Sequence, residues 1–238
     1  MQNNFSKIQI KNLVSKYKQL GINKDLAERI YTSRLLGLKK DLVLHGGGNT
    51  SVKALAKDTD GEVHEVIYVK GSGSDLATIK AKDFPAVKLK PLYKLTKKKF
   101  ITDDEMVRHL RKNLIDDNSP NPSVETLVHS AIAEKFIDHT HSNAILEITN
   151  RKNGLSLCHD IFGKEILVVP YVMPGFLLAK KVDQLYKKNP DIKGIILFKH
   201  GIFTFGKSAH ESYGRMIKYV STAERYLKSE KSKKLKKI

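Results

Sequence analysis

Apolar residues in the first forty positions recur at helical spacing. They fall three to five positions apart on either side of a glycine, with Ile8, Leu13, Tyr17 and Leu20 before Gly21, and Leu26, Ile30 and Leu35 after it. Intervals of three and four place side chains on one face of a helix, and glycine is a common stop signal. This part of the chain is therefore predicted to form two helices joined by a short turn.

Further along the chain, short apolar runs predict strands and longer periodic segments predict helices. Strands are expected at 65–70, 136–141, 193–199 and 202–205. Helices are expected at 103–114, from Ser123 as capping residue to 132, at 142–148 and at 209–227. The lysine-rich stretch 83–100 is expected to be irregular. Because helices and strands are interleaved, residues 1–227 are predicted to form one layered α/β/α domain.

Two glycine-rich segments interrupt these elements, at 45–51 and at 71–75. Consecutive backbone N–H groups in tight turns form concavities that hold phosphate, and side-chain donors could come from Asn49, Thr50, Ser72 and Ser123. Loop glycines more often form plain turns, so each segment alone is weak evidence for an anion site. The second segment lacks the final glycine of a dinucleotide-binding fingerprint, and we set that interpretation aside.

Residues 201–208 formally match the phosphate-loop pattern G-x-x-x-x-G-K-S. A phosphate loop wraps its backbone around an anion, whereas the interior of this segment, Ile-Phe-Thr-Phe, is bulky and β-prone. We therefore expect a strand that ends in a turn at Gly206, and we do not expect a nucleotide site.

The net charge of +18 raises the question of a nucleic-acid or membrane partner. The basic residues are 36 Lys and 7 Arg, whereas base and phosphate recognition tends to use the planar fork of arginine. The lysines are also spread widely, with local runs at 97–99 and 228–238. A solvated surface accounts for both runs, and 228–238 is expected to be a disordered tail. We therefore expect neither kind of partner.

The rest of the composition favours a cytoplasmic protein. No stretch approaches the roughly 18 uninterrupted apolar residues of a membrane span, and the N-terminus lacks the apolar core of a secretory signal. Cys158 is the only cysteine, so an intrachain disulfide and a thiolate metal cluster are both excluded.

Histidines supply the candidate metal ligands. His139 and His141 are two apart in an expected strand, so both imidazoles point to the same side. His200 ends another apolar strand just before Gly201, where a turn would present its imidazole, and Glu125 lies in the first turn of an expected helix. Three imidazoles and one carboxylate suit a divalent ion such as zinc. Packing remains the commoner role of a single histidine, and spacing does not prove that the four residues converge.

Five ordered segments connect these candidates. They are His45-Gly-Gly-Gly-Asn-Thr-Ser51, Val69-Lys-Gly-Ser-Gly73, Pro122-Ser-Val-Glu-Thr126, Asp138-His-Thr-His141 and Lys199-His-Gly-Ile-Phe-Thr-Phe-Gly206. Taken together, they resemble the class II aldolase/adducin family over about residues 25–226. The branch that they resemble includes rhamnulose-1-phosphate aldolase domains, some of them fused to a short-chain dehydrogenase.

The resemblance implies an α/β/α fold with a central, mainly antiparallel sheet, and a homotetramer with active sites at subunit interfaces. It implies that zinc or another divalent metal is bound by Glu125, His139, His141 and His200, with Glu125 also the catalytic acid/base. It places a phosphate pocket at Gly48, Asn49, Ser72, Gly73 and Ser123. The chain departs from the fuculose-1-phosphate aldolase pattern at Val124, where a second serine would donate to phosphate.

The activity that the resemblance implies is cleavage of a ketose 1-phosphate, of the rhamnulose-1-phosphate kind, to dihydroxyacetone phosphate and an aldehyde through a zinc-stabilised enediolate. Family members also include sugar-phosphate epimerases, sugar-acid decarboxylases and a dehydratase, and the sequence does not separate these. A non-catalytic, adducin-like interaction module is a further alternative, which the four retained candidate ligands disfavour. The fused relatives also point to a separate dehydrogenase as a partner.

Overall fold

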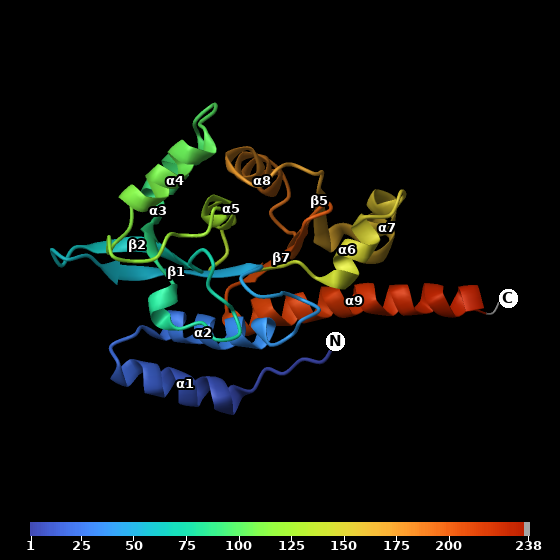
Figure 1. Cartoon of the computed structure of the whole chain (residues 1–238), viewed down its shortest axis with the longest axis horizontal. Helices are drawn as coiled ribbons and strands as arrows, with labels where there is room; N and C mark the ends of the chain where they lie inside the picture. Colours follow the sequence, from blue (N-terminus) through green and yellow to red (C-terminus); the bar gives the residue numbers. More distant parts are fainter. Residues whose placement is uncertain (236–238) are drawn as a thin grey trace.

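The computed structural model describes residues 1–235, and within this range seven strands form one sheet (Figure 1). The order of the strands across the sheet is β3-β2-β1-β4-β7-β6-β5. All neighbours pair antiparallel except β5 and β6, which pair parallel. The strands are β1 (Asn49–Lys57), β2 (Val63–Val69), β3 (Ala86–Lys88), β4 (Phe136–Thr140), β5 (Ile166–Val169), β6 (Gly194–Leu197) and β7 (Gly201–Gly206). The expected mainly antiparallel sheet is confirmed.

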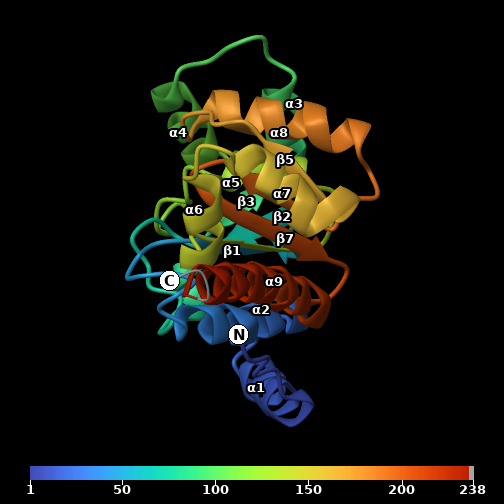
Figure 2. The same ribbon diagram turned by 90° about the vertical axis from the view of Figure 1, so that its right-hand side faces the viewer.

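Helices cover both faces of this sheet and complete three layers (Figures 1 and 2). One face is covered by α3 (Leu89–Thr96), α4 (Asp103–Lys112), α5 (Thr126–Ala131) and α8 (Phe176–Lys188). The other is covered by α2 (Lys24–Gly37), α6 (Asn143–Thr149), α7 (Gly154–Phe162) and α9 (Ala209–Leu235), with α1 (Lys7–Gln19) packed outside α2. None of the helices between residues 1 and 235 has both the length and the apolar character needed to cross a bilayer.

An apolar cluster lies on each face of the sheet. Successive side chains of a strand point to opposite faces, and β7 shows the alternation clearly. Phe203 and Phe205 belong to the cluster between the sheet and helices α5 and α8, whereas Ile202 belongs to the cluster between the sheet and helices α2 and α9. Residues 201–208 therefore form a strand followed by a turn, as expected, and do not form a phosphate loop.

The stretch 83–100 is not irregular, and that expectation was wrong. It contains β3 and α3. Leu89, Leu92 and Leu95 repeat every three residues and are buried, while the lysines between them are exposed. Spacing of this kind builds one apolar side of a helix, however basic the rest of the segment is.

The C-terminal helix also extends beyond its expected end. Residues 228–235 were expected to be disordered, but they continue α9, in which Leu227 is the last buried residue among positions 209–232. Lysine, glutamate and leucine are good helix formers, and the Ser229 and Ser232 hydroxyls donate back to carbonyls three and four residues earlier. The expectation for 236–238 concerns positions outside the described residues.

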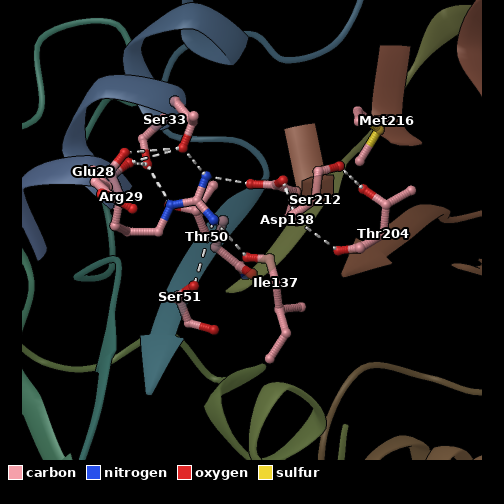
Figure 3. A network of polar contacts seen from close by, with 12 residues as sticks. Glu28, Arg29, Ser33, Thr50, Ser51, Ile137, Asp138, Thr204, Ser212 and Met216 are labelled. Atoms are coloured by element: carbon pink, nitrogen blue, oxygen red, sulfur yellow. Dashed lines mark hydrogen bonds and ion pairs between the residues drawn. The ribbon is translucent and has the colours of Figure 1, made fainter. Parts of the chain in front are cut away.

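A buried ion pair joins the sheet to the layer that contains α2 and α9 (Figure 3). The Nη2 atom of Arg29, from α2, lies 2.5 Å from Asp138 Oδ1 on β4, and both side chains are fully buried. Arg29 also donates to the carbonyls of Ser51 on β1 and Ile137 on β4. Ser212 of α9 donates to the other oxygen of Asp138. The central strand β4 is therefore fixed by polar contacts to both α2 and α9.

Breaking this ion pair should be costly. Arg29→Leu leaves Asp138 as an uncompensated buried charge, and we expect a loss of about 3–5 kcal/mol of unfolding free energy in a chemical denaturation experiment. Lys187→Ala removes an exposed pair with Asp183 on α8 and should change stability by less than about 1 kcal/mol. Equal losses in the two variants would contradict the importance assigned to the buried pair.

Candidate metal centre and active site

The three candidate histidines and Glu125 meet at one end of β4. His139 lies within β4, His141 follows directly after it, and His200 lies in the turn between β6 and β7. Their ring centroids are 4.8, 5.0 and 5.1 Å apart. Glu125 immediately precedes α5, above the same end of the strand. Residues far apart in the sequence are thus brought together.

The imidazole of His139 is oriented by two neighbours from β7. It stacks on Phe203 with the ring centroids 4.1 Å apart, and its Nδ1 lies 3.2 Å from the carbonyl of Ile202. A carbonyl oxygen only accepts, so Nδ1 carries the proton and Nε2 presents a lone pair. That lone pair faces His141, whose Nε2 is 3.0 Å away. Metal-binding histidines are commonly fixed in this way by a hydrogen bond from their other nitrogen.

The turn that presents the His200 imidazole precedes this residue in the chain. The N–H of His200 donates to the Leu197 carbonyl at 3.0 Å, and Lys199 has a left-handed backbone with φ +61°. A non-glycine residue in this conformation carries strain, which is often found near functional sites. Gly201, where the turn was expected, instead begins β7. A Cβ on Gly201 would lie 2.4 Å from the Thr140 carbonyl oxygen, so glycine is needed there for close packing.

The Glu125 carboxylate lies between two of the imidazoles. Its oxygens are 3.4 Å from His139 Nε2 and 3.5 Å from His200 Nε2, and Asn49 donates to it at 2.7 Å. Burial raises the pKa of Glu125 to about 7, although the Asn49 hydrogen bond and the Lys70 charge act in the opposite direction. A carboxyl group with this pKa can exchange a proton near neutral pH.

The histidines have the charge state that a metal requires. Burial lowers the pKa of His200 to about 4 and that of His139 well below its usual value, and it also lowers the pKa of His141, on which the charge of Lys70 has the same effect. All three are therefore neutral near pH 7, which is the form that ligates metal.

The donor set also fits a divalent ion in its geometry and its hydrogen bonding. Glu125 Oε1 and His200 Nδ1 are buried with no hydrogen-bond partner within residues 1–235. Two nitrogen ligands on one tetrahedral zinc ion lie about 3.3 Å apart, close to the 3.0 Å between the Nε2 atoms of His139 and His141. A coordinated ion would compensate for the lone pairs that converge here.

A second group of possible ligands, Asp58, Glu62 and His64, lies in the hairpin between β1 and β2. Here Asp58 already has partners, because His64 Nε2 is 2.6 Å and Lys88 Nζ is 3.5 Å from its Oδ2. Its other oxygen accepts backbone hydrogen bonds from Asp60 and Glu62. These contacts stabilise the hairpin, and the ammonium group of Lys88 already supplies a positive charge beside Asp58. The cluster is therefore explained by its role in the hairpin.

The two glycine loops are held together by Lys70, a residue to which the sequence analysis gave no role. Its Nζ donates to the carbonyls of Gly46 and Ser74 at 2.9 Å, so one ammonium group bridges both loops. The side chain is buried, and burial lowers its pKa, with Asp75 and Glu125 acting in the opposite direction. The sequence signal that could have indicated this role is the position of the lysine between Val69, at the end of an expected apolar strand, and Gly71.

The five residues expected at a phosphate pocket fall into two groups. The buried Asn49 and Ser123 lie beside Glu125, and Asn49 Nδ2 donates to Ser123 Oγ at 3.0 Å. Gly48, with φ +61°, precedes Asn49 and packs against the backbone of His139. Ser72 and Gly73 lie on the exposed loop that packs against Gly46.

The expected role of Ser123 as a helix cap was wrong. The helix begins three residues later, at Thr126, and the Ser123 hydroxyl accepts hydrogen bonds from Asn49 and from the backbone of Glu125 instead. Val124 is 48% exposed, so the position without a second serine faces outward.

The family of the chain follows from comparison with known sequences. Residues 27–227 match the family described as Class II Aldolase and Adducin N-terminal domain. An uncharacterized oxidoreductase of Bacillus subtilis, YuxG, is 38% identical over 218 residues, which are 92% of this chain. The chain spans 32% of the length of that relative. The chain belongs to the class II aldolase and adducin family.

Solved structures show the same fold. The N-terminal class II aldolase domain of a conserved Thermoplasma acidophilum protein is 40% identical, with a TM-score of 0.84 over 95% of this chain and 99% of that one. A sugar-phosphate aldolase from Thermotoga maritima matches with a TM-score of 0.61 at 18% identity, over 84% of this chain and 91% of that one. An L-fuculose-1-phosphate aldolase from Thermus thermophilus matches with a TM-score of 0.55 at 18% identity, over 85% and 95%. At that identity the last two support the fold alone.

Gly201 offers a test of the packing around the histidines. In Gly201→Ala the new methyl group would meet the Thr140 carbonyl and lie 3.0 Å from His139 Cε1, so we expect zinc affinity to fall about tenfold or more, as measured by calorimetry. Gly214→Ala in α9 is the matched control, because no atom lies within 4 Å of its added Cβ. Unchanged zinc affinity in Gly201→Ala would show that the cluster does not depend on this close packing.

Proposed function

We propose that the chain is a divalent-metal-dependent aldolase that cleaves a ketose 1-phosphate, of the rhamnulose-1-phosphate kind, to dihydroxyacetone phosphate and an aldehyde. The observation that supports this most directly is the convergence of three neutral imidazoles, two of which lie beside the Glu125 carboxylate. Family membership supports an aldolase-type enzyme, and the geometry adds a donor set suited to this chemistry.

His139, His141 and His200 would hold the metal, with Glu125 as an additional ligand when no substrate is bound. A bound ion such as Zn²⁺ would supply Lewis-acid stabilisation to the enediolate that carbon–carbon cleavage leaves behind. No Schiff-base lysine is then needed. The buried setting of the imidazoles keeps them unprotonated, and the hydrogen bond from His139 to Ile202 keeps its free nitrogen aimed at the cluster.

Glu125 would move the proton. Cleavage requires a base to take the hydroxyl proton of the substrate and an acid to return a proton to the carbanion carbon. A carboxyl group whose pKa is raised to about 7 by burial can do both near neutral pH. Asn49 donates to one oxygen of this group, and Ser123 accepts from the Glu125 backbone N–H. The other oxygen, 3.5 Å from His200 Nε2, has no hydrogen-bond partner within the described residues and is free to take up the proton.

The phosphate would be bound by the glycine loops. The proposed contacts are with Gly48, Asn49, Ser72, Gly73 and Ser123, and Lys70 would add a positive charge behind both loops. Backbone N–H groups in such loops are suited to phosphate oxygens. With Val124 facing outward, phosphate binding rests on one serine from this segment.

The cellular setting is also part of the proposal. We propose a cytoplasmic homotetramer, as the family resemblance implies. We also propose that a dehydrogenase consumes the aldehyde, because the Bacillus subtilis relative is named as an oxidoreductase and is about three times the length of the matched region.

Glu125→Gln should separate metal binding from proton transfer. The amide cannot take the hydroxyl proton, so kcat should fall by about 10²–10⁴-fold while one zinc ion per chain is still bound. Glu147→Gln, which alters an exposed carboxylate paired with Arg151, is the control and should cleave normally. A Glu125→Gln variant with normal turnover would remove this residue from the acid/base role.

The substrate class can be tested by metal analysis followed by a screen. We expect about one zinc per chain, and cleavage of one compound among rhamnulose, fuculose and ribulose phosphates and related sugar acids. Release of dihydroxyacetone phosphate would support the aldolase, whereas epimerisation or loss of carbon dioxide would assign another reaction of the family. A purified chain that bound no divalent metal under any condition would exclude the proposal.

A further inference from the structure

His129 is a fully buried histidine that the mechanism above does not use. It lies on α5, one helical turn after Glu125, and its backbone N–H donates to the Glu125 carbonyl at 3.1 Å. Burial lowers the pKa of His129 to about 3, and the positive charges of Arg29 and Lys53 lower it further. Its imidazole is therefore neutral, with one nitrogen that donates a hydrogen bond and one that accepts.

The neighbours of His129 determine which nitrogen donates. Its Nε2 contacts the amide oxygen of Asn49, and its Nδ1 lies 2.8 Å from the hydroxyl of Ser51. The amide oxygen can only accept, so the proton must be on Nε2. Nδ1 then accepts from the Ser51 hydroxyl. The contacts therefore define one tautomer.

Asn49 connects the His129 ring to Glu125 by hydrogen bonds of defined direction. With its oxygen facing His129, its Nδ2 donates to Glu125 at 2.7 Å and to Ser123 at 3.0 Å. A reversed amide would place its oxygen against the carboxylate and its N–H groups against the N–H of His129. Both contacts would be repulsive, and they would be buried where water cannot satisfy them.

We infer that His129 is a positioning residue. Through Asn49 it holds the Glu125 carboxylate toward the three histidines, and its other ring nitrogen accepts from the Ser51 hydroxyl. The kinetic consequence rests on the proposed function, because it requires Glu125 to act in turnover. The direction of each hydrogen bond from Ser51 to Glu125 does not depend on the proposed function. These directions can be measured without substrate or metal.

The kinetic test compares two substitutions of His129 with a neighbour. His129→Leu removes the donor, and we expect kcat to fall about 10–100-fold with little change in KM. His129→Gln retains an N–H near the position of Nε2 and should restore most of that loss. Val128→Ala, which truncates a buried side chain on the same helix, controls for lost packing and should keep the wild-type kcat.

The contact of His129 with Phe203 makes the glutamine variant decisive. The two rings meet edge to face with centroids 5.2 Å apart, and Phe203 stacks on His139. Leucine and glutamine both lose this ring contact, so a purely structural role predicts equal damage in both variants. A glutamine variant no better than leucine, or a leucine variant as active as Val128→Ala, would overturn the inference.

The substrate-free test is nuclear magnetic resonance of the metal-free protein labelled with ¹⁵N. We expect the His129 ring to be protonated on Nε2, and we expect the side-chain amide signals of Asn49 to shift in His129→Leu but not in Val128→Ala. A ring protonated on Nδ1, or unmoved Asn49 signals, would overturn the inference even if the chain proved not to be an aldolase. If His129→Leu does not fold, the wild-type ring decides alone, and protonation on Nδ1 in place of Nε2 would be the contrary result.

Discussion

The position of β4 is the constraint on which the rest of the site depends, and the Arg29–Asp138 ion pair fixes it. Asp138 and His139 are neighbours on that strand, so their side chains point to opposite faces. Slipping β4 by one residue would bring a histidine toward α2 and leave the guanidinium of Arg29 buried without a counter-charge. Such a pair adds little net stability over apolar packing, but it penalises the wrong register heavily.

The two halves of the candidate site are built in different ways. The imidazoles lie at the end of a central strand and in a tight turn, where Phe203 and Gly201 pack directly against His139. The glycine loops lie nearer the surface, and the buried ammonium group of Lys70 holds them together. Rigid elements thus position the groups suited to chemistry, while the residues proposed to bind phosphate lie partly on surface loops.

Sequence patterns predicted the local features well and the long-range ones poorly. The period of two in a strand was enough to place His139 and His141 on one side, and leucine and isoleucine spacing located most helices. The pairing of Asn49 with His139 across β1 and β4 was not predictable, because strand register depends on the whole sheet. The left-handed Lys199 carries no sequence signal at all, since its residue type rarely adopts that conformation.

The distances along the chain between the clustered residues also bear on synthesis. Glu125 and His200 are 75 positions apart, and β7, which packs against His139, ends only at Gly206. A nascent chain that stops before His200 has the first two histidines but neither the third nor the strand that orients His139. Metal capture at this site would therefore mark a chain whose sheet is complete, and bound ion would stabilise only the finished fold by mass action.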